Sequence, residues 1–444
     1  MDKLISTLML ALTAAGLAGA PALAQTAAAP AVSMDVQNIF NTMLFLIGGF
    51  LVMWMAAGFA MLEAGMVRSK NVSMQCLKNI ALYSTAGIMF WVIGYNLMYM
   101  NVGGGFFGTP TPVSFPEAGK GVVDKAANYA AASDWFFQMV FCATTASIVS
   151  GTVAERIKIW PFLIFVVVLT GVLYPITGSW KWGKGWLEVR GFADFAGSTL
   201  VHSVGGWAAL TGAIIIGARK GRYQSNGGVV PFPGSSIPLA TLGTFILWLG
   251  WFGFNGGSQL ALGTVANAAD VARIFVNTNI AAASGVIVVL VLTQIIYKKV
   301  DVTIALNGAL AGLVSITAEP LTPSLWVAAF VGGIGGVIVV FGVPMLDKLK
   351  IDDVVGAIPV HLVAGIWGTF IVPLSNKGAS YGVQLLGIVS IGAFTIVTTA
   401  VLWYALKFTI GVRPTEEEEM AGMDHTEVGI EAYPEFGSGA PRVI

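Results

Sequence analysis

The chain has 444 residues and no formal net charge, and 56% of its residues are hydrophobic while only 10% are charged. A soluble domain carries roughly 25% charged residues, so this composition, with a mean hydropathy of +0.79, excludes an ordinary water-soluble fold. The zero net charge also gives no electrostatic reason to expect a nucleic-acid partner. Because the apolar runs are long and continuous rather than alternating, they favour membrane-spanning α-helices over a β-barrel.

The first residues have the pattern of a secretory signal peptide. Lys3 precedes an apolar stretch at 4–16, and the small residues Ala22 and Ala24 mark a cleavage position. We predict that residues 1–24 are removed, which places the mature N-terminus outside the cell membrane. An uncleaved first helix is the alternative.

Residues 25–411 are predicted to form the transmembrane domain, because about 20 apolar residues suffice to cross a bilayer. The candidate spans lie at 38–66, 73–100, 131–153, 158–179, 197–218, 235–256, 272–297, 303–318, 324–345, 355–374 and 383–410. Arg68, Arg156 and Arg219 then fall in cytoplasmic loops, which agrees with the positive-inside rule. The predicted fold class is therefore an all-α membrane protein with eleven transmembrane helices and a cytoplasmic C-terminus. A miscounted span would invert everything beyond it.

Residues 412–444 change character and are predicted to form a soluble cytoplasmic tail. The tail contains an acidic run from Glu416 to Glu419, and such a run is more often solvated than a docking site. The two cysteines, Cys76 and Cys142, lie in apolar runs, which argues against a disulfide or a thiolate metal site.

Two segments of the chain, 194–206 and 353–365, match at a constant offset of 159 residues. They share an Asp, a Gly, a Val, a His and a Gly at corresponding positions. The chain has only three histidines, and two of them, His202 and His361, occupy matched positions.

Each matched segment ends a half of five predicted helices. Five is odd, so the halves would have opposite orientations, and inverted repeats place their site between the halves near the bilayer midplane. The predicted organisation is two repeats and one final helix, at about 38–218, 235–374 and 383–410.

An ionisable residue inside a membrane helix is costly and indicates a functional site. His202 and His361 can each donate and accept a hydrogen bond, so two adjacent rings could share a proton. The alternatives are histidines satisfied by helix carbonyls, or a pair of metal or haem ligands. Asp194 lies at the start of its helix, where it could cap the helix, serve the site or do both, whereas its copy Asp353 is better explained as a cap.

Several aromatic residues are placed where they could recognise a cation at the outer surface. Phe137 and Phe141 lie one helical turn apart, Trp182 follows the fourth span, and the segment 251–258 closes the sixth. Aromatic faces attract a small cation by roughly 0.5–2 kcal/mol. A single Trp could equally belong to an interfacial aromatic belt.

At these residues the chain resembles the Amt/Mep/Rh ammonium transporter family, in particular its bacterial Amt branch. The segments that carry the resemblance are 62–65, 154–157, 194–219, 250–258 and 411–414 with the Glu run that follows. Two places depart from the family pattern. Gly178 and Ser179 stand where many members have Ala-His, which could alter the outer mouth, and Leu362 follows His361 where Gly is common.

The resemblance implies an ammonium-binding site at the outer surface, formed by Phe141, Trp182 and Ser258. Phe137 would lie beside this site, and Asp194 would support it.

Further inside, Phe141 and Phe254 would form a stacked gate, and Trp251 would line the pore with His202 and His361. The resemblance also implies a homotrimer in the cell (inner) membrane and a PII-type signal protein that binds the tail. It implies no cofactor and no enzymatic activity.

A bare ammonium ion would incur a large desolvation cost in an apolar lumen, and loss of a proton removes most of that cost. We therefore expect ammonium to be deprotonated near the gate and conducted as ammonia, with or without separate proton transfer. One alternative is an ammonium sensor that signals through its tail. Another is a membrane redox protein with haem between the histidines, although no C-x-x-C-H motif is present.

Overall fold

The structure of the protein is a computed structural model that describes residues 32–115 and 128–435. The predicted signal peptide therefore lies outside the described residues. Residue contacts divide the chain into two units, Met1–Ser33 and Met34–Ile444, and all the named helices belong to the second. Within the described residues every named element is a helix, and the β-structure consists of one isolated bridge between Tyr223 and Val229.

The helices of the first half begin at Met34 and end at Ile216. They are α2 (Met34–Met66), η2 (Ser69–Asn71), α3 (Val72–Met89), η3 (Phe90–Gly94), α4 (Tyr95–Tyr99), α5 (Ala131–Thr152), α6 (Ile159–Val168), η4 (Leu169–Leu173), α7 (Tyr174–Ser179), α8 (Trp186–Val189), η5 (Ser198–Ser203) and α9 (Val204–Ile216).

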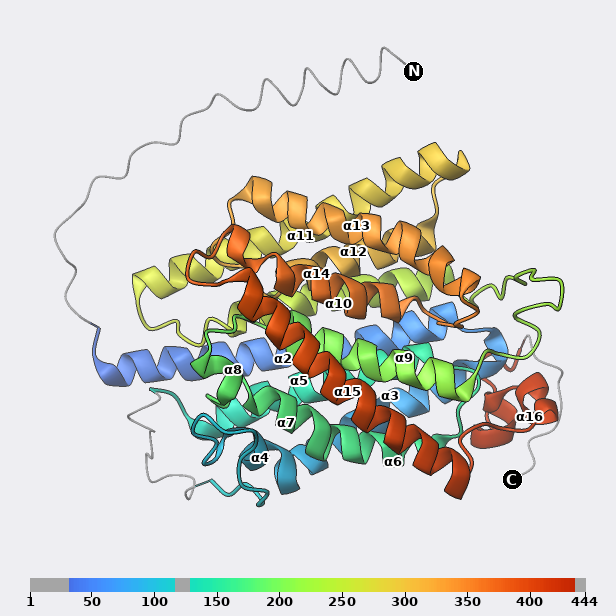
Figure 1. Cartoon of the computed structure of the whole chain (residues 1–444), viewed down its shortest axis with the longest axis horizontal. Coiled ribbons are helices and arrows are strands. Elements are labelled where there is room, and N and C mark those ends of the chain that lie inside the picture. Colours follow the sequence, from blue (N-terminus) through green and yellow to red (C-terminus); the bar gives the residue numbers. More distant parts are fainter. Residues whose placement is uncertain (1–31, 116–127, 436–444) are drawn as a thin grey trace, which may run out of the picture. The chain divides into compact units, whose positions relative to one another are not determined.

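The second half and the tail continue in the same way (Figure 1). Their elements are α10 (Ile237–Gly257), α11 (Val265–Tyr297), α12 (Val302–Ile316), α13 (Leu325–Lys348), η6 (Ile358–Val363), α14 (Ala364–Phe370), η7 (Val372–Leu374), α15 (Tyr381–Thr409), α16 (Glu416–Ala421) and η8 (Asp424–Val428).

Each of the eleven predicted spans overlaps a helix or a run of consecutive helices. Within the described residues, eight helical segments are long and apolar enough to cross a membrane, and two shorter apolar helices lie at Val302–Ile316 and Ile358–Leu374. The all-helical membrane fold is thus confirmed, whereas the count of eleven spans stays a prediction. α11 begins several residues before its predicted start, because the Thr264 hydroxyl accepts the Asn267 N–H and caps an earlier turn.

The two matched segments have the same local structure. η5 and η6 are both π-helical, and each follows a glycine with positive φ, 107° at Gly197 and 78° at Gly356. Asp194 accepts four backbone N–H groups of the first helix, and Asp353 accepts the N–H of Ile358 in the second. Both aspartates therefore cap their helices. π-Helical turns are rare and occur frequently at functional sites.

Close backbone contact joins the two halves, because α2 packs along α10. A Cβ at Gly243 would lie 2.3 Å from the backbone nitrogen of Leu62, and one at Gly65 would lie 2.4 Å from that of Ala240. Small residues allow membrane helices to approach this closely. The first helix of each predicted repeat is thereby fixed against the other.

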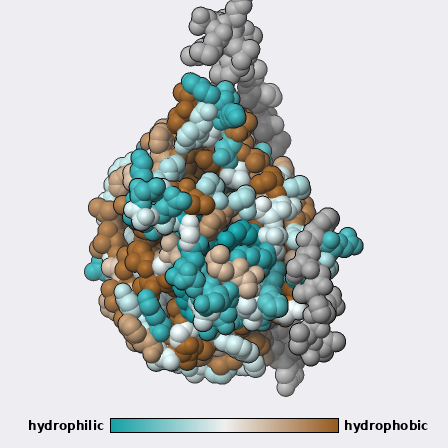
Figure 2. Space-filling view, turned by 90° about the vertical axis from the view of Figure 1, so that its right-hand side faces the viewer, coloured by the Kyte–Doolittle hydropathy of each residue, from teal (hydrophilic) through white to brown (hydrophobic). Residues whose placement is uncertain are grey.

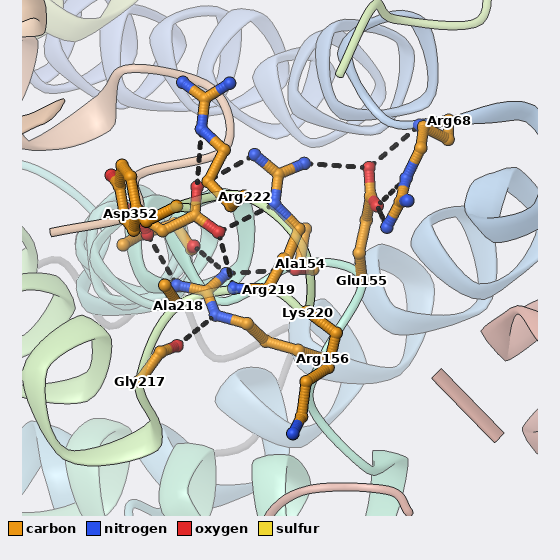
Figure 3. Close-up of polar contacts among 12 residues, drawn as sticks. Arg68, Ala154, Glu155, Arg156, Gly217, Ala218, Arg219, Lys220, Arg222 and Asp352 are labelled. Atoms are coloured by element: carbon orange, nitrogen blue, oxygen red, sulfur yellow. Dashed lines mark hydrogen bonds and ion pairs between the residues drawn. The ribbon is translucent and has the colours of Figure 1, made fainter. Parts of the chain in front are cut away.

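One end of the unit carries the charged loops and the tail helix α16. Figure 2 views this end, and hydrophilic residues gather near its middle while hydrophobic residues lie toward its edge. Figure 3 shows the ion pairs beneath this surface. Glu155 binds Arg68 and Arg219, and Arg219 continues to Asp352 with a 2.8 Å Nε–Oδ2 contact. Glu155 has a left-handed φ of 67°, so the segment 154–157 is held in a strained turn.

The tail is folded against this end through its carboxylates. Asp424 accepts the backbone N–H groups of Ser73 and Met74 at the start of α3, at 2.9 and 2.8 Å. Glu427 accepts the N–H of Ile159, the first residue of α6, at 2.9 Å. A carboxylate at a helix N-terminus satisfies free N–H groups and the helix dipole. The described part of the acidic tail is therefore docked and does not extend freely into water.

Candidate functional site

The structure brings the two matched histidines together in the interior. His202 comes from η5 and His361 from η6, and their side chains are buried. Their Nδ1 atoms are 3.2 Å apart, and the ring centroids are 5.2 Å apart at an interplanar angle of 22°. One ring therefore donates a hydrogen bond to the other. The second ring nitrogen of His202, Nε2, is buried without a hydrogen-bond partner.

This geometry argues against the redox alternative. Two axial nitrogens on one haem iron would be about 4 Å apart, since each metal–nitrogen bond is about 2 Å long. The Nδ1 atoms of His202 and His361 are closer than that and make a direct hydrogen bond. The pair is arranged to share a proton rather than to hold an iron between its rings.

An aromatic column continues from the histidine pair toward the predicted outer end. The ring of His202 stacks on Trp251 at 4.9 Å and on Phe254 at 5.2 Å between centroids. Phe254 in turn stacks on Phe141 at 3.9 Å with an angle of 26°. The two residues of the predicted gate are therefore in direct stacking contact, and both side chains are buried.

The predicted recruitment residues surround the far side of Phe141. Phe137 lies 4.7 Å from it between ring centroids, and Trp182 lies 6.1 Å away, edge-on at 85°. Ser258 lies one turn beyond Phe254 at the end of α10, where its hydroxyl donates to the Phe254 carbonyl at 2.8 Å. A Cβ at the preceding Gly257 would meet the Phe137 ring at 2.5 Å, so this end of α10 packs closely against the cluster.

Asp194 acts through the backbone around this cluster. Both of its carboxylate oxygens are occupied by N–H groups of the η5 start, at 2.8 to 3.0 Å. Its main-chain carbonyl accepts the indole N–H of Trp182 at 3.1 Å. The same residue thus fixes the helix that carries His202 and the orientation of Trp182. This is a physical route by which Asp194 could support the outer cluster, the role that the family resemblance implies for it.

Two supporting residues were missed by sequence reasoning. Thr317 accepts the Trp251 indole N–H at 2.7 Å and its main-chain carbonyl accepts the Ala196 N–H, so it links the column to the Asp194 loop. Gln384 of α15 makes hydrogen bonds to both the N–H and the carbonyl of Ala193. Neither has a sequence signal, because a Thr or Gln in an apolar run is common.

Glu63 and Lys78 were also missed, although both are ionisable residues inside predicted spans. They are buried and form an ion pair of 3.8 Å near the histidines. The rule that an ionisable residue in a span marks a site would have found them.

The residues that depart from the family pattern are accommodated by local packing. The Ser179 hydroxyl donates to the Phe106 carbonyl at 3.0 Å, and a Cβ at Gly178 would lie 2.4 Å from the methyl of Met98. Leu362 is buried against α9. With these residues in place, the successive rings of the aromatic column remain in contact with one another.

Comparison with known proteins places this geometry in context. The chain matches the Ammonium Transporter Family over residues 43–433. It is 40% identical over 422 residues to the ammonium transporter Amt2 of Archaeoglobus fulgidus, covering 88% of this chain and 87% of that protein. The solved structure of a sensor Amt protein superposes with a TM-score of 0.82 at 33% identity, over 89% of this chain and all of that chain. Candida albicans Mep2 superposes with a TM-score of 0.78 at 26% identity, over 93% and 94% of the two chains.

Proposed function

Because this chain belongs to the ammonium transporter family, we propose that it recruits ammonium at the outer aromatic cluster and conducts ammonia past its paired histidines. The observation that carries the proposal is the continuous contact of Phe141, Phe254, His202 and His361, with successive ring centroids 3.9, 5.2 and 5.2 Å apart. A hydrogen-bonding histidine pair directly behind a closed aromatic gate suits a cargo that can lose a proton.

The chemistry of the cluster favours ammonium over an alkali cation. Phe141 and Trp182 offer aromatic faces, each of which attracts a cation by roughly 0.5–2 kcal/mol. Ser258 adds a hydroxyl oxygen that can accept a hydrogen bond. Potassium cannot donate hydrogen bonds or give up a proton, so it would carry its full desolvation cost into the apolar column.

The proton can follow one of two routes. If it passes through the His202–His361 hydrogen bond, transport is electrogenic, and if it stays outside, transport is electroneutral. Proteoliposomes tested with ammonium, methylammonium and potassium would separate the two routes. We expect the proteoliposomes to take up ammonium but not potassium. Uptake without current would contradict the electrogenic route, and absence of uptake would contradict the function.

The assembly and regulation of the transporter form part of the same proposal. We propose a homotrimer in the cell inner membrane with one pore per subunit, and a PII-type protein that binds the cytoplasmic tail. The docking of Asp424 and Glu427 on the starts of α3 and α6 supports regulation through the tail. Native mass spectrometry would test the trimer. Deletion of 412–444 should abolish PII pull-down, and unchanged capture would contradict tail binding.

Ammonium sensing is a second candidate function, and the likeness to a sensor Amt protein is the observation that favours it. A sensor would change its tail on binding ammonium without sustained uptake. Radiolabelled methylammonium uptake in proteoliposomes distinguishes the two, since a pure sensor shows binding but no accumulation.

A further inference from the structure

Three elements converge on a buried ion pair on the other side of the histidines from the gate. Glu63 of α2 is 1% exposed, and Lys78 of α3 is fully buried. Lys78 Nζ lies 3.8 Å from Glu63 Oε2 and donates to the Ser150 carbonyl of α5 at 2.8 Å. The Ser150 hydroxyl donates to the same Oε2 at 2.8 Å. The ion pair with Lys78 and the hydrogen bond from Ser150 are thus both made to Oε2, and the Asn79 side chain lies near the same carboxylate.

The second oxygen, Glu63 Oε1, is buried without a hydrogen-bond partner. A buried acceptor left unsatisfied costs roughly 1–3 kcal/mol, and more when it is charged. A pair that served only to hold helices together would be expected to satisfy both oxygens. The free oxygen therefore indicates a ligand that donates a hydrogen bond.

A small cavity borders this carboxylate. Its lining includes Glu63, His361, Phe59, Ser147 and Asn307. The Asn307 amide is directed to the Val355 carbonyl at 3.1 Å, so it does not satisfy Glu63. Glu63 and the second histidine of the pair thus line the same space.

The order of contacts along α2 gives the direction of this space relative to the gate. Phe45 contacts Phe137 of the outer cluster at 5.4 Å, and Phe59 contacts His361 at 6.2 Å, both between ring centroids. Glu63 follows Phe59 by one turn, about 6 Å further along the helix axis. The chain of contacts therefore runs from the outer cluster through the histidines to Glu63.

We propose that Glu63 Oε1 is an inner binding site for ammonium, occupied after ammonia has passed His361 and regained a proton. That proton is delivered through the His202–His361 hydrogen bond in the electrogenic route and is taken from cytoplasmic water in the electroneutral route. This inference rests on the proposed transport function. An ammonium ion carries N–H donors that satisfy Oε1, and methylammonium retains three of them. The positive charge of Lys78 offsets the negative charge of the carboxylate. The ammonium ion is therefore held by a hydrogen bond near a neutral pair and can leave. Conduction requires binding weak enough for the ion to leave, and an unpaired carboxylate would attract the cation more strongly.

The test measures methylammonium uptake in oriented vesicles. In inside-out vesicles the inner end faces the medium, and Glu63→Gln should raise the half-saturating concentration about tenfold, as expected for loss of a charged hydrogen bond. In right-side-out vesicles the half-saturating concentration should stay unchanged. Glu319→Gln is the matched control, because Glu319 is a buried carboxylate that accepts hydrogen bonds from Thr322 and Asn376 and does not line this cavity. It should resemble wild type in both orientations.

A second variant separates loss of the inner site from misfolding. It is needed because Glu63→Gln alone leaves Lys78 buried without its ion-pair partner. Glu63→Gln with Lys78→Gln removes both charges and should show the same one-sided change. The inner site would be overturned if the variants had the same half-saturating concentration in both orientations. It would also be overturned if their maximal rate fell with no change in the half-saturating concentration. Either outcome would leave the transport function intact. If the wild type shows no saturable uptake in either orientation, the proposed function fails and the inference fails with it.

Discussion

The Nδ1 atoms of the two histidines are hydrogen-bonded to each other, so each ring depends on its partner. The double substitution His202→Ala and His361→Ala removes the hydrogen-bonded pair of ionisable rings that lies between the gate and the inner cavity. We expect initial methylammonium uptake to fall about tenfold or more, a loss of roughly 1.4 kcal/mol or more of transition-state stabilisation. Uptake and selectivity equal to wild type, in protein of normal thermal stability, would show that the pair is only structural.

Thr317 is a single residue on which the orientation of Trp251 depends. Thr317→Val keeps the shape of the side chain but removes the acceptor of the 2.7 Å indole hydrogen bond. The buried N–H would then be unsatisfied, so the free energy of unfolding should fall by about 1–3 kcal/mol. Thermal unfolding in detergent measures this, together with uptake, which should also decrease. Thr317→Ser retains the hydroxyl and is the control. Equal losses in both variants would assign the effect to packing.

At the scale of elements, the network of Figure 3 joins loops from both halves of the chain. Burial alone would raise the pKa of Asp352, but hydrogen bonds from Arg219 and the charges of Arg219 and Arg156 outweigh it and lower that pKa below its ordinary value of 3.8. A carboxyl with a depressed folded pKa stabilises the fold above its unfolded pKa, and this stabilisation is lost as pH falls toward the folded pKa.

We therefore expect the contribution of Asp352 to thermal stability to be constant from pH 7 to about pH 5 and to decline below about pH 4. At pH 7, Asp352→Asn should destabilise the fold by roughly 3–5 kcal/mol, because it breaks a buried ion pair. The difference between wild type and variant should shrink as the pH is lowered. Melting temperatures in detergent at several pH values measure this, and a difference independent of pH would contradict the assignment.

The tail is a second element whose position depends on few residues. Asp424→Ala removes the carboxylate that caps α3, a change that typically costs about 1 kcal/mol. We expect faster proteinase K cleavage within the tail, measured by mass spectrometry of the fragments. Glu417→Ala is the matched control, because Glu417 is an exposed acidic residue of α16. Equal protection in the two variants would show that Asp424 does not hold the tail.

At the scale of the whole molecule, residue patterns predicted the helices and placed His202 and His361 at one site between the two halves. Hydrophobic runs and an internal repeat are signals that can be read along the chain. The contact of Phe141 with Phe254 was implied by the family resemblance. The pairing of Glu63 with Lys78 and the support of Trp251 by Thr317 could not be read in this way. Those contacts depend on which faces of neighbouring helices meet, and apolar helices in a membrane carry little amphipathic pattern to show it.

The orientation of the whole molecule in the membrane is a prediction, and the arrangement of the basic loops says which end faces the cytoplasm. Arg68, Arg156 and Arg219 meet at the end that carries the tail, so the positive-inside rule places that end in the cytoplasm. Alkaline phosphatase requires disulfides, which form outside the cytoplasm. Fused after residue 435 it should be inactive. Inserted after Gly104, which follows the second predicted span and so lies outside in this topology, it should be active. The opposite pattern would invert the molecule, and activity at both positions would mean that the number of spans between them is even rather than odd.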